Sequence, residues 1–204
     1  MNGRVAIDPE APVHRELDQI EVDGRATIGA DRVVVMLNKP RGLVTTVSDE
    51  QGRDTVYRCL AGAALPWLAP VGRLDKASEG LLLFTNDSMW AARLTEPSQK
   101  LDKTYHVQIN RVATASWLDA LQRGVHDAGE ALTAKSVRLL RSGGKNSWLE
   151  VILEQGKNRH IRRLLGALDT TVLRLVRVGL GTLVLGELAK GQWRRLTDQE
   201  IDAL

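Results

Sequence analysis

The chain has 204 residues and a formal net charge of +3, and 43% of it is hydrophobic, enough for one substantial domain or two small ones. Its single cysteine, Cys59, excludes an internal disulfide framework, and its four histidines are scattered rather than grouped as metal ligands would be. Because no signal peptide and no run of the ~18 apolar residues that cross a bilayer is present, we expect a cytoplasmic protein without metal or membrane segment.

The first 30 residues differ in composition from the rest of the chain. Residues 7–23 are polar and acidic and contain two prolines, and glycines follow before an apolar strand that we expect over residues 33–37. This change predicts a boundary near residue 30, with a leader over residues 1–30 and the main domain over residues 31–204.

Helices and strands are expected to mix along the main domain without strict alternation. Caps, turn residues and hydrophobic periodicity predict, in chain order, a short helix over 55–60, a connector over 66–70, a buried strand from Gly80, a helix capped by Asn86 or Asp87 that runs to Thr95 before Pro97, a strand over 104–109, a helix from Thr114 to Gly124, and a hairpin over 135–141 and 147–154. Such a mixture indicates an α+β fold.

A charged loop precedes the buried strand. Gly72 permits close backbone approach, Asp75 and Ser78 suit a turn, and the apolar residues after Gly80 supply a rigid support. An isolated aspartate in such a place is more often a solvated turn residue, with neighbours such as Glu79 facing water. The sequence around Asp75 alone therefore leaves both a structural and a catalytic role open.

A basic segment follows Gly156. Residues 157–177 carry six lysines and arginines against Asp169 alone, and the apolar residues from Ile161 to Leu168 fall on one face of a helix. On that helix Arg159 and Arg163 point away from the apolar face, where they suit phosphates, whereas Arg162 lies near its edge and could reach a partly buried carboxylate. The segment indicates a polyanionic partner, although a solvated basic face would look the same.

Four segments in a fixed order carry a family resemblance: 37–40 with Gly42, 72–84, 103–105 with Val107, and 156–163, followed by a terminal 191–197 stretch. Together they resemble the bacterial pseudouridine synthases that act on ribosomal RNA, over roughly residues 32–200. The resemblance implies an α+β fold with a mixed, mainly antiparallel sheet and flanking helices. Residues 1–30 resemble the last hairpin of the small RNA-binding module that often precedes this catalytic domain. Either its helical first half is lost or the start codon lies inside it.

The resemblance implies isomerisation of a uridine within RNA, with the N1–C1′ bond replaced by a C5–C1′ bond and without a cofactor. Asp75 is the expected nucleophile, whether it attacks the sugar or the base. Arg162 is the expected cation beside it, and Tyr105 is expected to stack on the uracil and to assist proton removal from C5. The uridine should be flipped out of its helix, and Arg73 would fill the vacated stack or contact a phosphate.

The remaining RNA contacts are expected from basic and polar residues of the matched segments. Lys39 and Lys103 are assigned to RNA contact or to loop geometry, and the basic segment contributes Lys157, Asn158, Arg159 and Arg163. One departure from the family is His160, which stands where glutamine is usual and which we expect on the helix surface rather than as a base.

Two other functions compete with this hypothesis. A hydrolase would use Asp75 with Glu79 as nucleophile and acid, and an RNA-binding ribosome-assembly protein without turnover would keep the basic helix but not need Asp75. We expect the isomerase, acting as a monomer on ribosomal RNA and more on the large than the small subunit.

Overall fold

The computed structural model describes residues 2–6, 8, 13, 18–22, 25–26, 31–96 and 98–204. The chain divides into two units, residues 1–32 and 33–204. In the first unit, β1 (Glu21–Val22) and β2 (Arg25–Ala26) pair antiparallel. The leader was predicted from two prolines and from the glycines that follow them, and these residues lie outside the described part of the chain. The same holds for Pro97, which was expected to follow the helix that ends at Thr95.

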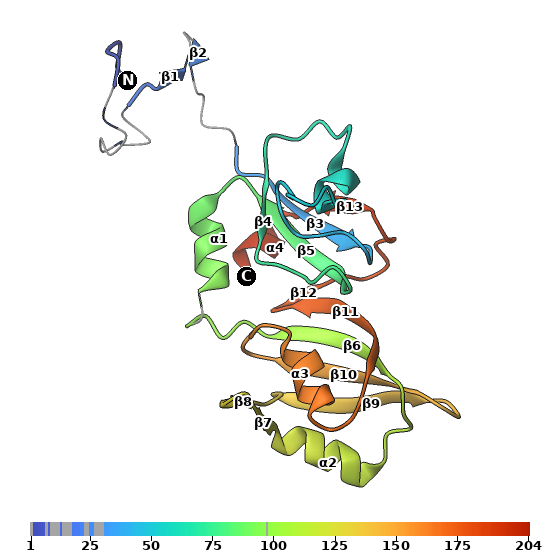
Figure 1. Ribbon diagram of the computed structural model, residues 1–204. Helices are drawn as coiled ribbons and strands as arrows, with labels where there is room; N and C mark the ends of the chain where they lie inside the picture. The colour runs from blue at the N-terminus through green and yellow to red at the C-terminus, as the bar shows by residue number, and fades with distance from the viewer. Residues whose placement is uncertain are drawn as a thin grey trace. The chain divides into compact units, whose positions relative to one another are not determined.

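The second unit is built on one large sheet (Figure 1). Within the described residues the sheet has nine strands in the order β13-β3-β5-β11-β6-β10-β9, with β4 beside β5 and β12 beside β11. The strands are β3 (Val34–Lys39), β4 (Ala69–Val71), β5 (Glu79–Thr85), β6 (Lys103–Ile109), β9 (Ser136–Ser142), β10 (Ser147–Leu153), β11 (Val172–Leu180), β12 (Leu183–Val184) and β13 (Trp193–Arg195).

One pairing in this sheet is parallel. β5 and β11 meet over only two residue pairs, Val176 with Glu79 and Arg177 with Gly80, whereas the other neighbours pair antiparallel. Gly80 has a φ of +101°, and a Cβ there would lie 2.8 Å from the backbone nitrogen of Arg177. This short seam therefore joins two antiparallel halves of the sheet, and only glycine allows the strands to approach so closely.

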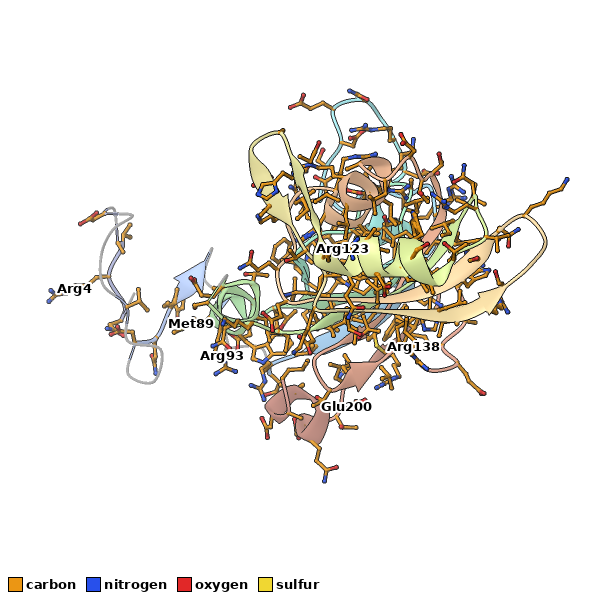
Figure 2. All side chains as sticks on the ribbon, turned by 90° about the horizontal axis from the view of Figure 1, so that it is seen from below. Arg4, Met89, Arg93, Arg123, Arg138 and Glu200 are labelled. Atoms are coloured by element: carbon orange, nitrogen blue, oxygen red, sulfur yellow. The ribbon has the colours of Figure 1, made fainter. Side chains whose placement is uncertain are left out.

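Helices cover both faces of the sheet. The short 3-10 helix Val56–Leu60, α2 (Ala115–Arg123) and α3 (His160–Gly166) pack into the larger hydrophobic core, and α1 (Ser88–Thr95) and α4 (Asp198–Asp202) pack into a second core on the opposite face. Figure 2 shows Arg123, at the end of α2, and Arg138, on β9, on opposite sides of the sheet. No helix in the described part of the chain is long and apolar enough to span a bilayer.

Capping residues begin helices α1 and α2 where the sequence predicted. The Asp87 side chain accepts the N–H of Trp90 at the start of α1, and the Thr114 side chain accepts the N–H of Trp117 at the start of α2. The predicted hairpin is confirmed as β9 and β10, and the α+β class is confirmed. The connector over 66–70 was predicted as a loop, but its end is the strand β4, because Ala69–Val71 pairs with the edge of β5.

Candidate active site

The loop that carries Asp75 is held from below by Lys39 on β3. The Lys39 side chain is fully buried, and its ammonium donates to the carbonyls of Pro40, Asp75 and Ser78 at 3.1, 3.2 and 2.8 Å. Burial lowers the pKa of Lys39 to about 8, although the nearby carboxylates Glu79 and Asp75 raise it. Of the two roles expected for Lys39, RNA contact or loop geometry, these contacts support loop geometry, because the side chain has no exposed surface and its ammonium binds the loop.

Two further contacts fix the same loop. The N–H of Gly42 donates to the carbonyl of Lys76 at 2.8 Å, and the N–H of Ser78 donates to that of Asp75 at 2.9 Å. The Asp75 side chain is left half-exposed, with 38% of its surface accessible. The loop thus presents one carboxylate on a backbone that is hydrogen-bonded from several directions.

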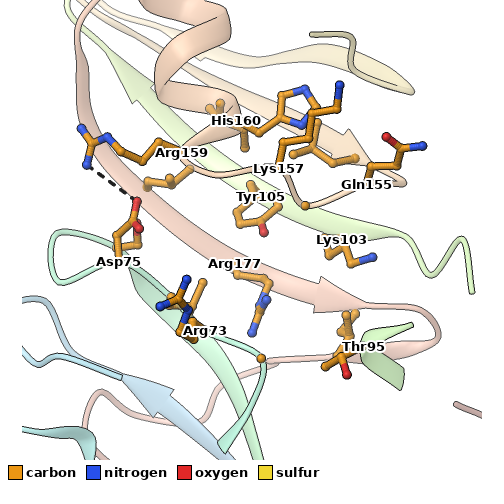
Figure 3. Close-up of a pocket in the computed structure, with 18 of the residues that line it drawn as sticks. Arg73, Asp75, Thr95, Lys103, Tyr105, Gln155, Lys157, Arg159, His160 and Arg177 are labelled. Atoms are coloured by element: carbon orange, nitrogen blue, oxygen red, sulfur yellow. Dashed lines mark ion pairs between the residues drawn. The ribbon is translucent and has the colours of Figure 1, made fainter. Parts of the chain in front are cut away.

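Arg159 is the cation that faces Asp75 directly. Its Nη1 lies 3.9 Å from Oδ2 of Asp75, the ion pair drawn as a dashed line in Figure 3. Arg159 has a φ of +48° at the N-cap of α3, and this left-handed backbone lies at the turn between β10 and the helix. The sequence assigned Arg159 to phosphates and expected Arg162 in this position.

Arg162 supports the Asp75 loop without an ion pair to the carboxylate. Its Nη2 donates to the carbonyl of Ala77 at 3.3 Å, and its buried Nε has no hydrogen-bond partner among the described residues. Burial lowers the pKa of Arg162, the charge of Arg159 lowers it further, and Asp75 raises it. Arg162 therefore acts on Asp75 through the backbone and through its charge.

Asp75, Tyr105 and Arg162 line one cavity of about 520 Å³, a size typical of ligand pockets. Tyr105 on β6 is only 8% exposed, and Figure 3 shows it within this cavity beside the Asp75 loop. The cavity wall holds six basic residues and three carboxylates: Arg73, Lys103, Lys157, Arg159, Arg162 and Arg177, with Asp75, Glu96 and Glu154. This wall favours an anionic ligand that brings a flat group to Tyr105.

A second cavity of about 630 Å³ adjoins the first at Asp75. The two share Arg73, Asp75, Lys157 and Arg159, while Asn158 lines only the second. Lys157 is tied to the fold, because its ammonium donates to the carbonyl of Ala131 at 2.9 Å. A chain-like ligand could thus pass Asp75 on both sides.

Arg163 lies elsewhere than expected. Its guanidinium binds the carboxylates of Asp127 and Glu130, which belong to the hairpin of β7 (Val125–Asp127) and β8 (Glu130–Leu132). These partners raise the pKa of Arg163. With two carboxylates engaged, Arg163 fixes the hairpin against α3, and it lines neither cavity.

His160 and Glu79 also differ from expectation. His160 is 6% exposed, so the expected helix-surface position is wrong, and burial lowers its pKa. The Glu79 side chain is 3% exposed and pairs with Arg174 at 2.8 Å and Lys190 at 2.6 Å. Burial raises the pKa of Glu79, but the hydrogen bonds from these two partners bring it below its usual range. Glu79 lines neither cavity, so the hydrolase hypothesis lacks its acid.

The sequence reasoning missed Arg177 as a site residue. It is 7% exposed, it lines the first cavity, and its Nε donates to the carbonyl of Leu81 at 2.7 Å. The signal available in the sequence was the position of Arg177 among the apolar residues of the segment that forms β11. Among the described residues no group of three histidines, cysteines or carboxylates is placed to hold a metal ion.

Comparisons with known proteins point to one family. A family model described as RNA pseudouridylate synthase matches residues 33–167. The chain is 32% identical to a Bacillus subtilis protein named ribosomal large subunit pseudouridine synthase B, over 100% of this chain and 84% of that protein. It is 30% identical to ribosomal large subunit pseudouridine synthase E of Vibrio vulnificus, over 82% and 76% of the two chains. A solved structure titled crystal structure of pseudouridylate synthase superposes with a TM-score of 0.75 at 28% identity, over 99% and 86% of the chains.

Proposed function

Because the chain belongs to the RNA pseudouridylate synthase family, we propose that it converts one uridine of large-subunit ribosomal RNA to pseudouridine. The family resemblance and the enzyme class predicted from the sequence are confirmed by the family match. The names of the Bacillus subtilis and Vibrio vulnificus relatives support the large subunit as substrate. The observation that carries the proposal is the cavity that Asp75 and Tyr105 both line, together with six lysines and arginines.

Asp75 is the nucleophile in this proposal. A covalent bond from its carboxylate to the substrate, as the N1–C1′ bond breaks, divides one difficult substitution into two easier ones. The uracil turns within the cavity, C5 bonds to C1′, and the carboxylate is released. C5 gives up its proton and N1 takes one up, so the atoms balance within one nucleotide without a redox partner.

The cations around Asp75 offset the loss of hydration of its carboxylate when the uridine displaces water. Arg159 pairs with the carboxylate at 3.9 Å, and Arg162 contributes its charge while binding the loop carbonyl of Ala77. The pairing with Arg159 is loose, and both side chains are partly exposed, so the substrate can separate them without a large loss of free energy. Arg162 then remains as the half-buried charge beside the nucleophile.

Tyr105 and Arg73 act on the flipped base and on the position that it leaves. The uracil stacks on the Tyr105 ring. The Tyr105 hydroxyl assists removal of the proton from C5 after the new bond forms. Arg73 is exposed and lies where both cavities meet, two residues before Asp75. Flipping the uridine out of its helix costs a few kcal/mol. In this proposal Arg73 enters the position in the helix that the uridine leaves. Because ribosomal RNA is the substrate in this proposal, we expect the enzyme to act in the cytoplasm and as a monomer.

Pseudouridine mapping tests the substrate. Ribosomal RNA is compared from cells with and without the gene, by carbodiimide adducts and primer extension, after complementation with wild type or Asp75→Asn. We expect one large-subunit site to vanish with the gene and to return only with wild type. Return of the site with Asp75→Asn would exclude the nucleophile. An unchanged map with slowed ribosome assembly would favour the non-catalytic RNA-binding protein.

A further inference from the structure

Two cations of the cavity, Lys103 and Arg177, lie together beyond Tyr105. Arg177 on β11 is the cross-strand partner of Tyr105 on β6, which places their Cβ atoms about 5 Å apart. Lys103 is two residues from Tyr105 and so shares its face of the strand. Figure 3 shows Lys103 on the side of Tyr105 away from Asp75 and Arg159, with Arg177 below the ring.

Both cations are buried to an extent that normally requires an anionic partner. Arg177 is 7% exposed, and its Nε is bound to the carbonyl of Leu81. Its two terminal nitrogens have no hydrogen bond to the protein within the described part of the chain. Lys103 is half-buried, and among the described residues its ammonium donates only to the backbone carbonyl of Glu154, at 2.9 Å. Burying such charges without a counter-charge is costly, so the cavity is poised for an anion.

The nearby carboxylates do not supply that counter-charge. Asp102 and Glu154 both pair with Lys135, at 2.9 and 3.5 Å. Glu96, at the end of α1, lines the cavity but is exposed and makes an ion pair with neither cation. Burial lowers the pKa of Lys103, and the charge of Arg177 lowers it further while Asp102 raises it, so the two cations repel each other in the free protein.

We propose that Arg177 and Lys103 form a phosphate subsite that binds the RNA backbone next to the flipped uridine. The inference rests on the proposed function, because it takes the ligand of the cavity to be RNA. Uracil is neutral and leaves both charges unpaired, whereas RNA brings one phosphate per nucleotide. The fork of Arg177 matches phosphate oxygens in pairs, and Lys103 adds a point charge. With the uracil on Tyr105, this contact fixes the ribose relative to Asp75.

Binding of a short oligouridine tests the subsite without knowledge of the target site. We expect Lys103→Gln and Arg177→Gln each to bind roughly tenfold more weakly, the loss typical of a hydrogen bond to a charged group. In the double variant the slope of log K against log salt should fall by about 0.7, the value for one phosphate on a single strand. Lys103→Arg should restore binding. Arg123→Gln, an exposed charge on α2 outside both cavities, is the matched control and should keep the wild-type slope.

Methylphosphonate substitution identifies the phosphate and separates this contact from a general loss of charge. Single neutral linkages are placed along a ribosomal RNA hairpin that wild type binds. We expect one position to weaken wild type and to have no further effect on the Lys103→Gln/Arg177→Gln double variant. If every position weakens that variant as much as wild type, or if the salt slopes are unchanged, the subsite is refuted. Failure of wild type to form pseudouridine in ribosomal RNA would instead overturn the proposed function, and the oligouridine slopes would still decide the subsite.

Discussion

Substitution of Gly80 by alanine should open the seam between β5 and β11. A Cβ at this position would lie 2.8 Å from the nitrogen and 2.9 Å from the carbonyl carbon of Arg177, with the carbonyl oxygen closer still. Backbone strain at a φ of +101° costs about 1–3 kcal/mol for alanine. Forcing the two strands apart adds about 1–3 kcal/mol. Since whole domains are stable by about 5–15 kcal/mol, Gly80→Ala should lose a large share of stability and most activity.

Gly42→Ala is the matched control for this substitution. Gly42 has a φ of +102°, but a Cβ there meets nothing within 4 Å, so only the backbone strain applies. Urea unfolding of the two variants should therefore give free energies of unfolding that differ by the steric part, about 1–3 kcal/mol. Equal losses in Gly42→Ala and Gly80→Ala would refute the claim that close strand approach dictates glycine at the seam.

Three further substitutions test the support of Asp75 and its surroundings. The pKa of about 8 for Lys39 lies below its unfolded value of 10.5, so the unfolded state binds more protons between these limits. The free energy of unfolding of wild type relative to Lys39→Met should therefore rise by at most about 3 kcal/mol from pH 8 to 10.5, and parallel pH profiles of the two proteins in chemical denaturation would contradict this. Turnover of the variant should fall at all pH values, because the loop loses its hydrogen-bond donors. Arg163→Gln should increase hydrogen exchange across residues 125–132 and leave the salt dependence of RNA binding unchanged, whereas a reduced slope would indicate a phosphate contact. Arg162→Gln should reduce single-turnover rates more than Arg159→Gln, because only Arg162 also binds the carbonyl of Ala77, and the opposite order would assign the essential charge to Arg159.

Much of the fold could be predicted because local rules and tertiary packing agree. Asp87 and Thr114 cap helices as their types predict, and the alternating pattern of residues 104–109 is buried on one face of β6. The strand β4 could not be predicted, because Ala69–Val71 is too short to show a period and is extended only by pairing with β5.

The candidate site could be predicted only in part, because Arg177 was missed and Arg163, which was expected, lines neither cavity. The family segments brought Asp75, Tyr105 and Arg162 to one cavity. Helical periodicity places side chains around an axis but says nothing of what packs against each face. It therefore could not show that Arg163 meets two carboxylates of a hairpin some 30 residues earlier, or that His160 is covered.

Pseudouridine formation by the purified protein tests the central claim most directly. An unmodified large-subunit ribosomal RNA transcript is incubated with wild type, Asp75→Asn or Asp119→Asn, an exposed carboxylate on α2 outside both cavities. Binding is measured in parallel so that loss of turnover is not confused with loss of affinity. The account predicts conversion of one uridine by wild type and Asp119→Asn, and none by Asp75→Asn at nearly unchanged affinity. Conversion by Asp75→Asn at the wild-type rate would contradict it.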